Sequence, residues 1–192
     1  MLQNKAGLMA YELKTIVTYL QMHHRPNYAQ NQKPISAETS LIRAYEPTID
    51  FYRFLYNTVG KPWYWMERTL LNDTALADII NSVGVEIYVL YVSGVPAGFS
   101  EINRTVKGKE VQLSYFGLMP DFIGKGLGGY FLRATIDIAW NSNPKRVWVH
   151  TCDLDHPNAL GLYQKNGFVV YNQAEEALPD PRIVGLPLPS TH

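Results

Sequence analysis

The sequence contains almost no cysteine and carries no net charge. Cys152 is the single cysteine among 192 residues, so no disulfide can form within the chain and no zinc cluster can be built on thiolates. Lysine and arginine together number 17, as do aspartate and glutamate. This balance removes the strong electrostatic attraction that favours nucleic acids or anionic membranes, although it is compatible with a local charged patch. We therefore expect neither nucleic acid nor membrane among the partners.

Long apolar runs are also missing. No stretch approaches the ~20 residues that span a bilayer, and residues 1–14 lack the apolar centre of a secretory signal. These absences predict a soluble protein in the reducing cytoplasm. A chain of 192 residues can bury one well-packed core, and it shows no internal repeat, so we expect a single domain over residues 1–192.

Aromatic residues, by contrast, are abundant. The chain holds 13 Tyr, 7 Phe and 4 Trp, and residues 51–65, "FYRFLYNTVGKPWYW", are especially rich in them. Aromatic side chains bury large areas in cores, and Tyr and Trp also serve at pockets and interfaces. Two interpretations of this segment stay open: core packing with an oligomer contact, or the wall of a binding cleft.

Turn signals and residue periodicity divide the first half of the chain into one strand, a polar loop and helices. Thr48 can cap a helix whose Phe51, Phe54 and Leu55 share one face and which Gly60 ends. The predicted elements of this half are a strand at 11–22, a loop at 23–40, a helix at 49–60 and further helical pieces within 61–82.

The second half begins with three strands joined by short glycine-containing links, which suit antiparallel hairpins. Strands and helices then alternate. The predicted strands are 85–92, 97–106, 110–118, 146–151, 168–171 and an edge strand at 182–188, and the predicted helices run from about 127 to 141 and over 156–166. This order predicts an α/β (α+β) layer fold with a mixed, mostly antiparallel sheet of about six to seven strands.

A glycine-rich loop lies between the strand at 110–118 and the helix that follows it. Residues 121–131 read "DFIGKGLGGYF", with Gly124, Gly126, Gly128 and Gly129 beside Lys125. Unpaired N–H groups and the helix dipole favour an anion at a helix start, and glycines let the backbone approach a bulky one. The loop therefore predicts a pyrophosphate site, and a turn without a ligand is the alternative.

The pattern of the loop limits which phosphate ligand it suits. No Ser or Thr follows Lys125, so the ATP-binding P-loop pattern fails. Gly124, Gly126 and Gly129 match the dinucleotide pattern G-x-G-x-x-G, but the match lies late in the chain and follows antiparallel strands instead of opening a parallel sheet. A nicotinamide or flavin enzyme is therefore the second choice.

Two stretches carry a family resemblance. "YFGLMPDFIGKGLGGYFL" and "HTCDLDHPNALGLYQKNGF" together resemble the GNAT superfamily of acetyl-CoA-dependent N-acetyltransferases, closely over residues 110–171. The family's acyl-CoA motif, [Q/R]-x-x-G-x-[G/A], corresponds to Ile123 through Gly128. Ile123 departs from the usual Arg or Gln, which removes a side-chain contribution but leaves the backbone loop intact. The resemblance implies a GNAT-like fold with helices on both faces of the sheet.

The resemblance further implies acetyl-CoA as cosubstrate and transfer of its acetyl group to a primary amine of a small molecule or peptide, by direct attack in a ternary complex. Asn158 would bind the pantetheine or adenosine arm, with helix capping as the alternative use of its side chain. The residues implied to bind acetyl-CoA are Leu118, Met119, Gly124, Lys125, Gly126, Leu127, Gly128, Gly129 and Asn158.

The same resemblance implies two catalytic residues. Tyr163 matches the family's acid and is expected to donate a hydrogen bond to the leaving thiolate, unless it only packs on the sheet. Glu101 is the predicted base, and a solvated carboxylate on a strand face is the alternative. His150 is the second candidate for the base, unless it is a satisfied core residue. His156, in a loop or cap position, has no fixed-spacing cluster around it, so no metal site is expected.

Two other classes of function stay open at this stage. Ile123 makes a non-catalytic acyl-CoA-binding module conceivable, and the glycine pattern leaves a dinucleotide-dependent enzyme as the less favoured choice. The sequence also leaves open a homodimer, the acyl-chain preference and the identity of the acceptor amine.

Overall fold

A computed structural model describes residues 11–27, 36, 38–105 and 109–189 of the chain. Seven strands are present within these residues: β1 (Glu12–Met22), β2 (Thr39–Ala44), β3 (Val85–Val92), β4 (Val95–Asn103), β5 (Glu110–Leu118), β6 (Arg146–Cys152) and β7 (Val169–Pro179). The α-helices of the same part are α1 (Ile49–Gly60), α2 (Asp73–Ile80), α3 (Leu127–Trp140) and α4 (Ala159–Lys165). Short 3-10 helices lie at Lys61–Trp63, Pro120–Phe122 and Pro181–Val184.

The strands form one sheet in the order β2-β3-β4-β5-β6-β1-β7. Neighbouring strands are antiparallel, except that β5 and β6 run parallel. The predicted mixed, mostly antiparallel sheet is thereby confirmed.

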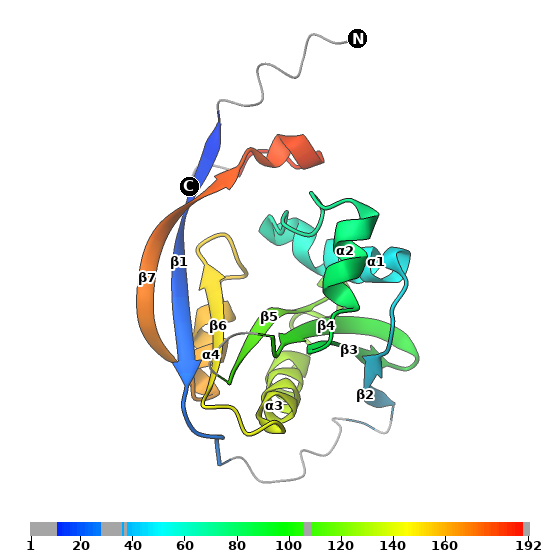
Figure 1. Ribbon diagram of the computed structural model, residues 1–192, viewed down its shortest axis with the longest axis vertical. Helices are drawn as coiled ribbons and strands as arrows, with labels where there is room; N and C mark the ends of the chain where they lie inside the picture. The colour runs from blue at the N-terminus through cyan, green and yellow to red at the C-terminus, as the bar shows by residue number, and fades with distance from the viewer. Residues whose placement is uncertain (1–10, 28–35, 37, 106–108, 190–192) are drawn as a thin grey trace.

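Strand β1 lies between β6 and β7, far from the next strand in sequence (Figure 1). Val17 is the partner of Cys152 on one side and of Ala174 on the other. The two long strands β1 and β7 run side by side along one edge of the molecule (Figure 1). The beginning of the described chain and its end are therefore joined in one antiparallel pair.

Helices cover both faces of the sheet, as expected. The side chains of α1 and α2 pack with Ile87, Val89 and Phe99 of β3 and β4 in one buried cluster. Helices α3 and α4 pack on the opposite face in a second cluster, which includes Val147 and Val149 of β6. In the part of the chain that the structure describes, no helix is long and apolar enough to cross a membrane.

The predicted start of α1 is confirmed in detail. Thr48 accepts a hydrogen bond from the Phe51 N–H at 3.3 Å, as an N-cap does. The buried face of the helix differs from the expectation, because Phe54 is 47% exposed and Tyr52 and Tyr56 are buried beside Leu55.

Three predictions from the sequence are corrected by the structure. The edge strand expected at 182–188 is wrong, since Pro181 begins a 3-10 helix that the Asp180 carboxylate caps. Strand β2 was not predicted, and β7 continues to residue 179 instead of ending at 171. Residue 106, the predicted end of the 97–106 strand, and residues 28–35 and 37 of the predicted loop at 23–40 lie outside the described residues.

Candidate active site

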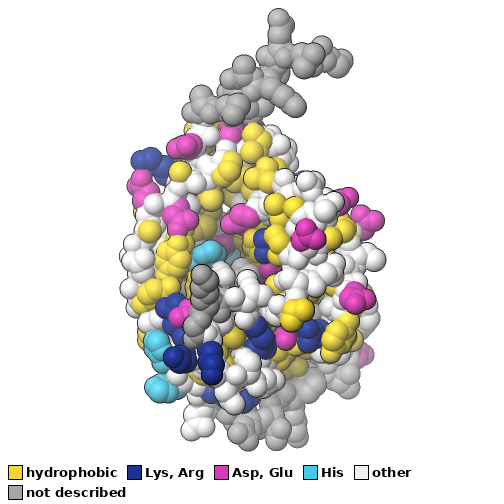
Figure 2. Space-filling view, in the orientation of Figure 1, with side chains coloured by type: hydrophobic (Ala, Val, Ile, Leu, Met, Phe, Trp, Pro, Cys, Tyr) yellow, Lys and Arg dark blue, Asp and Glu magenta, His cyan; other side chains and the backbone are white. Residues whose placement is uncertain are grey.

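The site begins where β5 and β6 separate. Their parallel pairing covers residues 110–112 of β5 and 146–148 of β6, and the two strands diverge beyond Gln112 and Trp148. A cleft of about 310 Å³ opens there, lined by described residues of β1, β5, β6, β7, α4, the glycine loop and the segment between α1 and α2. Figure 2 shows hydrophobic and acidic side chains gathered in the hollow between the β1–β7 side and the α1–α2 side.

The divergence leaves backbone groups of β5 facing the cleft. Met119, one of the residues implied to bind acetyl-CoA, is buried, and its N–H already donates to the Ala97 carbonyl of β4 at 2.9 Å. Because successive N–H groups of a strand point to opposite sides, the Leu118 N–H is directed away from β4, toward the gap. Leu118 also lines the cleft.

The glycine loop leads from β5 into α3. Gly124 and Gly126 have φ angles of 79° and 77°, a left-handed conformation that glycine adopts without strain. A Cβ added to either would meet no atom within 4 Å, so space lies open beside the backbone. Within the described residues no hydrogen bond reaches the N–H groups of residues 124–126. The loop thus presents free donors at the start of a 14-residue helix.

Other residues of the loop complete its surface. The Lys125 ammonium lies over the Phe122 ring, 5.1 Å from its centroid. Ile123 is 37% exposed and lines the cleft together with Gly128. A Cβ on Gly128 would come within 3.7 Å of Leu162, so α3 and α4 approach closely here. Leu127 and Gly129 follow in the first turn of α3.

Tyr163 of α4 is buried and lines the cleft. Its hydroxyl makes no hydrogen bond to another described residue. Among the described residues, the fully buried side-chain atoms without a partner do not include this hydroxyl, so it keeps some exposed surface. The hydroxyl therefore opens to the cleft. Burial, and then the negative charge of Asp155, raise the pKa of Tyr163, so the phenol stays protonated and available as a donor.

Asn158 stands at the start of α4 and also lines the cleft. Its side chain makes no capping hydrogen bond, while its backbone N–H donates to the His156 Nδ1 at 3.1 Å. The capping alternative is therefore absent from this structure, and the side-chain amide is left available to a ligand.

Glu101 lies in the middle of β4 and is completely buried, so the alternative of a solvated carboxylate does not hold. Arg68 donates to its Oε1 at 2.8 Å, and the Tyr52 hydroxyl donates to its Oε2 at 2.5 Å. Both oxygens are thus engaged, and Glu101 is not among the residues that line the cleft. Tyr163, Asn158 and Leu118 therefore lie together at the cleft, whereas Glu101 is buried behind the residues that line it.

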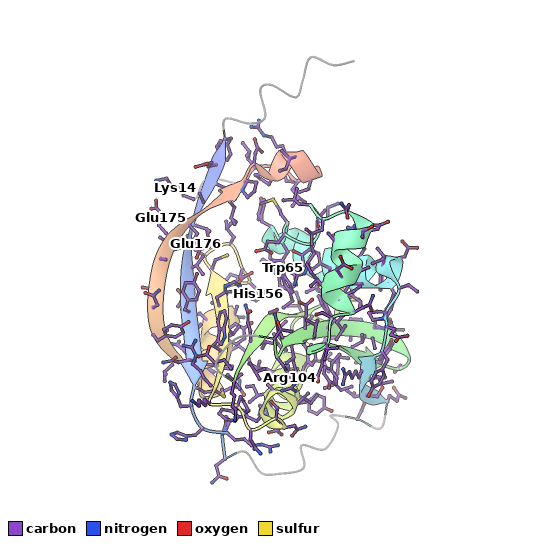
Figure 3. All side chains as sticks on the ribbon, in the orientation of Figure 1. Lys14, Trp65, Arg104, His156, Glu175 and Glu176 are labelled. Carbon is purple, nitrogen blue, oxygen red and sulfur yellow. The ribbon has the colours of Figure 1, made fainter. Side chains whose placement is uncertain are left out.

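The end of the cleft away from the glycine loop is aromatic and acidic. Trp63, Tyr64 and Trp65 come from the segment after α1, and Glu176 comes from β7 on the opposite side. Figure 3 shows Glu176 and Trp65 on opposite sides of the gap, with His156 below them. His150, the second candidate for the base, lines the floor.

A hydrogen bond joins the two walls of the cleft near this aromatic end. The Trp65 indole N–H donates to the Asp155 carboxylate at 3.1 Å, although ninety positions separate the two residues. The other oxygen of Asp155 accepts from the Thr151 hydroxyl at 2.7 Å and from the Cys152 N–H at 3.1 Å. Asp155 therefore holds the aromatic wall against the turn between β6 and α4.

Sequence reasoning did not find Glu67, Asp155 or Glu176, the carboxylates of this cleft. A cleft wall was one of two interpretations of the aromatic run at 63–65, but no element and no role were predicted for the segment around Glu176. Within the described residues no group of three or more His, Cys, Asp or Glu side chains is arranged to hold a metal ion.

The sequence profile of the acetyltransferase (GNAT) family matches residues 49–168. This is more than half of the chain. The chain belongs to the GNAT family. The match runs from the start of α1 to the residue before β7, so it includes the glycine loop and Tyr163, whereas β1, β2 and β7 lie outside it.

Solved structures agree with the GNAT fold. A conserved protein of unknown function from Staphylococcus epidermidis superposes with a TM-score of 0.59 at 15% identity, over 88% of this chain and 63% of that one. A GCN5-related N-acetyltransferase from Sphaerobacter thermophilus gives 0.60 at 13% identity, over 83% and 49%. The IAA acetyltransferase from Bacillus cereus gives 0.55 at 19% identity, over 70% and 79%.

The GNAT chain described here thus spans less than two thirds of the length of the first two of these proteins. At these identities the likeness concerns the fold. What the site binds and does has to be argued from its own residues.

Proposed function

We propose that this GNAT-family chain transfers an acetyl group from acetyl-CoA to a primary amine of a small molecule or peptide, by direct attack in a ternary complex. One observation carries the proposal. The cleft that opens between β5 and β6 joins the glycine loop and Tyr163 at one end to an aromatic, acidic wall at the other. A thioester bound from one end and an amine bound from the other would meet beside Tyr163.

The residues present fit the diphosphate and pantetheine of CoA. Free N–H groups at residues 124–126 can hold phosphate oxygens, and Lys125 adds a positive charge. The Leu118 backbone and the Asn158 amide border the gap that an extended pantetheine would enter. Gly128 keeps the start of α3 free of a side chain at this border. Ile123 adds an apolar contact where a polar side chain was expected.

The reaction forms a C–N bond and breaks the C–S bond of the thioester. An ammonium substrate must lose one proton before its nitrogen attacks, and the nitrogen loses a second proton as the amide forms. The thiol product takes up one proton, so one proton in all is released to water. Tyr163, a protonated phenol open to the cleft, would donate a hydrogen bond to the sulfur as negative charge develops on it.

The acceptor of the first proton remains a prediction. Glu101 is the base expected from the sequence, but both of its oxygens accept hydrogen bonds behind the cleft wall. It would have to receive the proton through Tyr52 or through a rearrangement of Arg68. His150 lines the cleft and needs no such relay. The variants Glu101→Gln and His150→Gln separate the two candidates for the base.

A thermal-shift comparison followed by a thiol-release assay tests the proposal. Acetyl-CoA is expected to raise the melting temperature, because a ligand that binds only the folded state stabilises it, while NAD(P) is expected to leave it unchanged. Acetyl-CoA with an amine panel should then release CoA thiol. Stabilisation by NAD(P) alone would contradict the proposal, and binding of acetyl-CoA without turnover of any amine would favour a non-catalytic module.

A further inference from the structure

The end of the cleft away from the glycine loop, where the amine acceptor would bind, carries only negatively charged side chains among the described residues. Among the described residues that line the cleft, Glu67, Asp155 and Glu176 are carboxylates, and none is Lys or Arg. Arg68, next to Glu67 in the chain, points to the buried Glu101 and is neutralised by it. Carboxylates with low-dielectric walls around them raise the local concentration of cations. The cleft therefore attracts an amine in its protonated form.

Two of the three carboxylates keep an oxygen for a ligand. The Tyr115 and Tyr56 hydroxyls donate to Oε2 of Glu67, at 2.9 Å and 3.3 Å, which fixes the carboxylate and leaves Oε1 without a partner among the described residues. The Tyr19 hydroxyl donates to Oε1 of Glu176, and within the same residues Oε2 is likewise left without a partner. Asp155, in contrast, already accepts three hydrogen bonds. Glu67 and Glu176 are thus the two positioned anions.

The remaining surface of this end is apolar and aromatic. Trp63 contacts the His156 ring edge-on at 5.1 Å between centroids, and Trp65 packs against Tyr115 at 5.1 Å. Leu70 and Leu178 also line the cleft here. Such walls suit a ring or another apolar body, and aromatic faces attract a cation. A sugar would leave its hydroxyls without enough polar partners on these walls.

Tyr64 is held in a backbone conformation that costs energy. Its φ and ψ angles of 59° and 31° are left-handed, which is uncommon for a bulky residue. The conformation is strained for a residue with a side chain, because its Cβ comes too close to the following carbonyl oxygen. Tyr64 lines the cleft together with its chain neighbours Trp63 and Trp65. Strain of this kind gathers at ligand sites, where the surrounding structure maintains it.

We infer that the acceptor is a small amine whose ammonium group is attracted by the carboxylates of Glu67 and Glu176 and whose aromatic body lies against Trp63, Tyr64 and Trp65. This inference rests on the proposed function and names the substrate class of the same cleft. Aminosugars carry more hydroxyls than this end can satisfy, and a polyamine would place its further ammonium groups against apolar walls without partners.

The test compares three amines with acetyl-CoA in a thiol-release assay. We expect kcat/KM for 2-phenylethylamine to exceed the values for ethylamine and for spermidine at least tenfold. Glu67→Gln and Glu176→Gln should each raise the KM for 2-phenylethylamine at least fivefold, because glutamine keeps the tyrosine hydrogen bond but removes the charge. Neither change should alter the dissociation constant of acetyl-CoA.

Two further variants separate an effect on amine binding from an effect on the stability of the fold. Glu175→Gln is the matched control, because Glu175 lies on the outer side of β7 in an exposed pair with Lys14, and it should leave KM unchanged (Figure 3). Tyr64→Gly relieves the left-handed strain, so the melting temperature should hold while KM for 2-phenylethylamine rises at least threefold.

The outcomes distinguish the inference from the proposed function. A preference for ethylamine or spermidine, or an unchanged KM in Glu67→Gln and Glu176→Gln, would overturn the inference and leave the acetyltransferase function standing. Transfer to no amine at all would overturn the proposed function and the inference with it. A preference for 2-phenylethylamine that both variants weaken, and that Glu175→Gln does not, supports the inference.

Discussion

Arg68 donates a hydrogen bond to Glu101 across 2.8 Å, and the carboxylate that accepts it has no exposed surface. The pair joins the segment after α1 to the middle of β4, directly behind the cleft. A buried charge without its partner is strongly unfavourable, whereas an intact pair contributes little net stability. This relationship gives Glu101 a structural role, and that role can be measured apart from catalysis.

Glu101→Ala is expected to lower the free energy of unfolding by about 3–5 kcal/mol, because Arg68 is left as an unpaired buried charge. Urea denaturation measures the change. Glu175→Ala, which breaks the exposed pair with Lys14, should hardly move the urea midpoint. Equal effects of the two changes would contradict the buried-pair explanation.

Glu101→Gln tests proton transfer, because glutamine keeps the size and an acceptor oxygen but cannot accept the proton as a carboxylate does. It also removes the charge opposite Arg68, so the urea midpoint of this variant is measured alongside its kinetics. If Glu101 is the base, kcat should fall at least tenfold in a folded variant while His150→Gln keeps most of its activity. The opposite pattern would assign the base to His150. Kinetics are to be measured well below the melting temperature of each variant.

Tyr163→Phe is expected to lower kcat at least tenfold with little change in the dissociation constant of acetyl-CoA. The hydroxyl opens to the cleft and stays protonated, so it acts when charge develops on the sulfur and not in ground-state binding. Steady-state kinetics and calorimetry measure the two quantities. Tyr45→Phe, at a residue that is 75% exposed, is the control, and unchanged turnover in Tyr163→Phe would remove Tyr163 from the mechanism.

Gly126→Ala and Gly185→Ala form a matched pair. Both glycines have left-handed φ angles, 77° and 75°, and a Cβ on either would meet no atom within 4 Å. Each change is therefore expected to cost about 1–2 kcal/mol of folding stability from backbone strain alone. Gly126→Ala should also weaken acetyl-CoA binding at least tenfold, since its Cβ enters the space beside the loop. Equal affinities in the two variants would argue against diphosphate binding there.

Tyr19 provides a test at alkaline pH. Its hydrogen bond to Glu176, together with burial, raises the pKa of Tyr19 to about 12. The folded state thus favours the neutral phenol, and the stabilisation is complete below the unfolded pKa of ~10 and lost as pH rises through about 12. Ultraviolet titration should show that Tyr19→Phe removes a component near pH 12 and that Glu176→Gln shifts it downward. Glu175→Gln should leave the titration as it is.

The sequence predicted those parts of the fold whose local signals agree with their burial. Thr48 caps α1 as expected, and the short glycine-containing link between β3 and β4 joins them as the predicted antiparallel hairpin. Strand β7 escaped detection beyond residue 171, because its residues 172–179 are mostly exposed at a sheet edge and carry no apolar alternation. Pro181 favoured a 3-10 turn over the predicted edge strand, since proline lacks the N–H that a strand ladder requires.

The site could be predicted where chemistry depends on consecutive residues and could not where it depends on distant strands. The glycine loop and the helix of Asn158 and Tyr163 are local patterns, and the structure places both beside the cleft. Glu176 reaches the same cleft only because β1 brings β7 next to β6, a topology that no local pattern contains. The burial of Glu101 likewise depends on Arg68, which is 33 positions away.

Strand β1 also constrains the order in which the molecule can assemble. Glu12 pairs with Pro179, so the last strand of the sheet closes over a loop of more than 160 residues. Until β1 is in place, β6, which supplies part of the cleft floor, exposes an unpaired edge on which other chains can add. Contacts between such distant residues slow folding. On the ribosome, residues 49–168, which match the family profile, emerge before β7 is available to complete the sheet. The cleft is therefore among the last features to form.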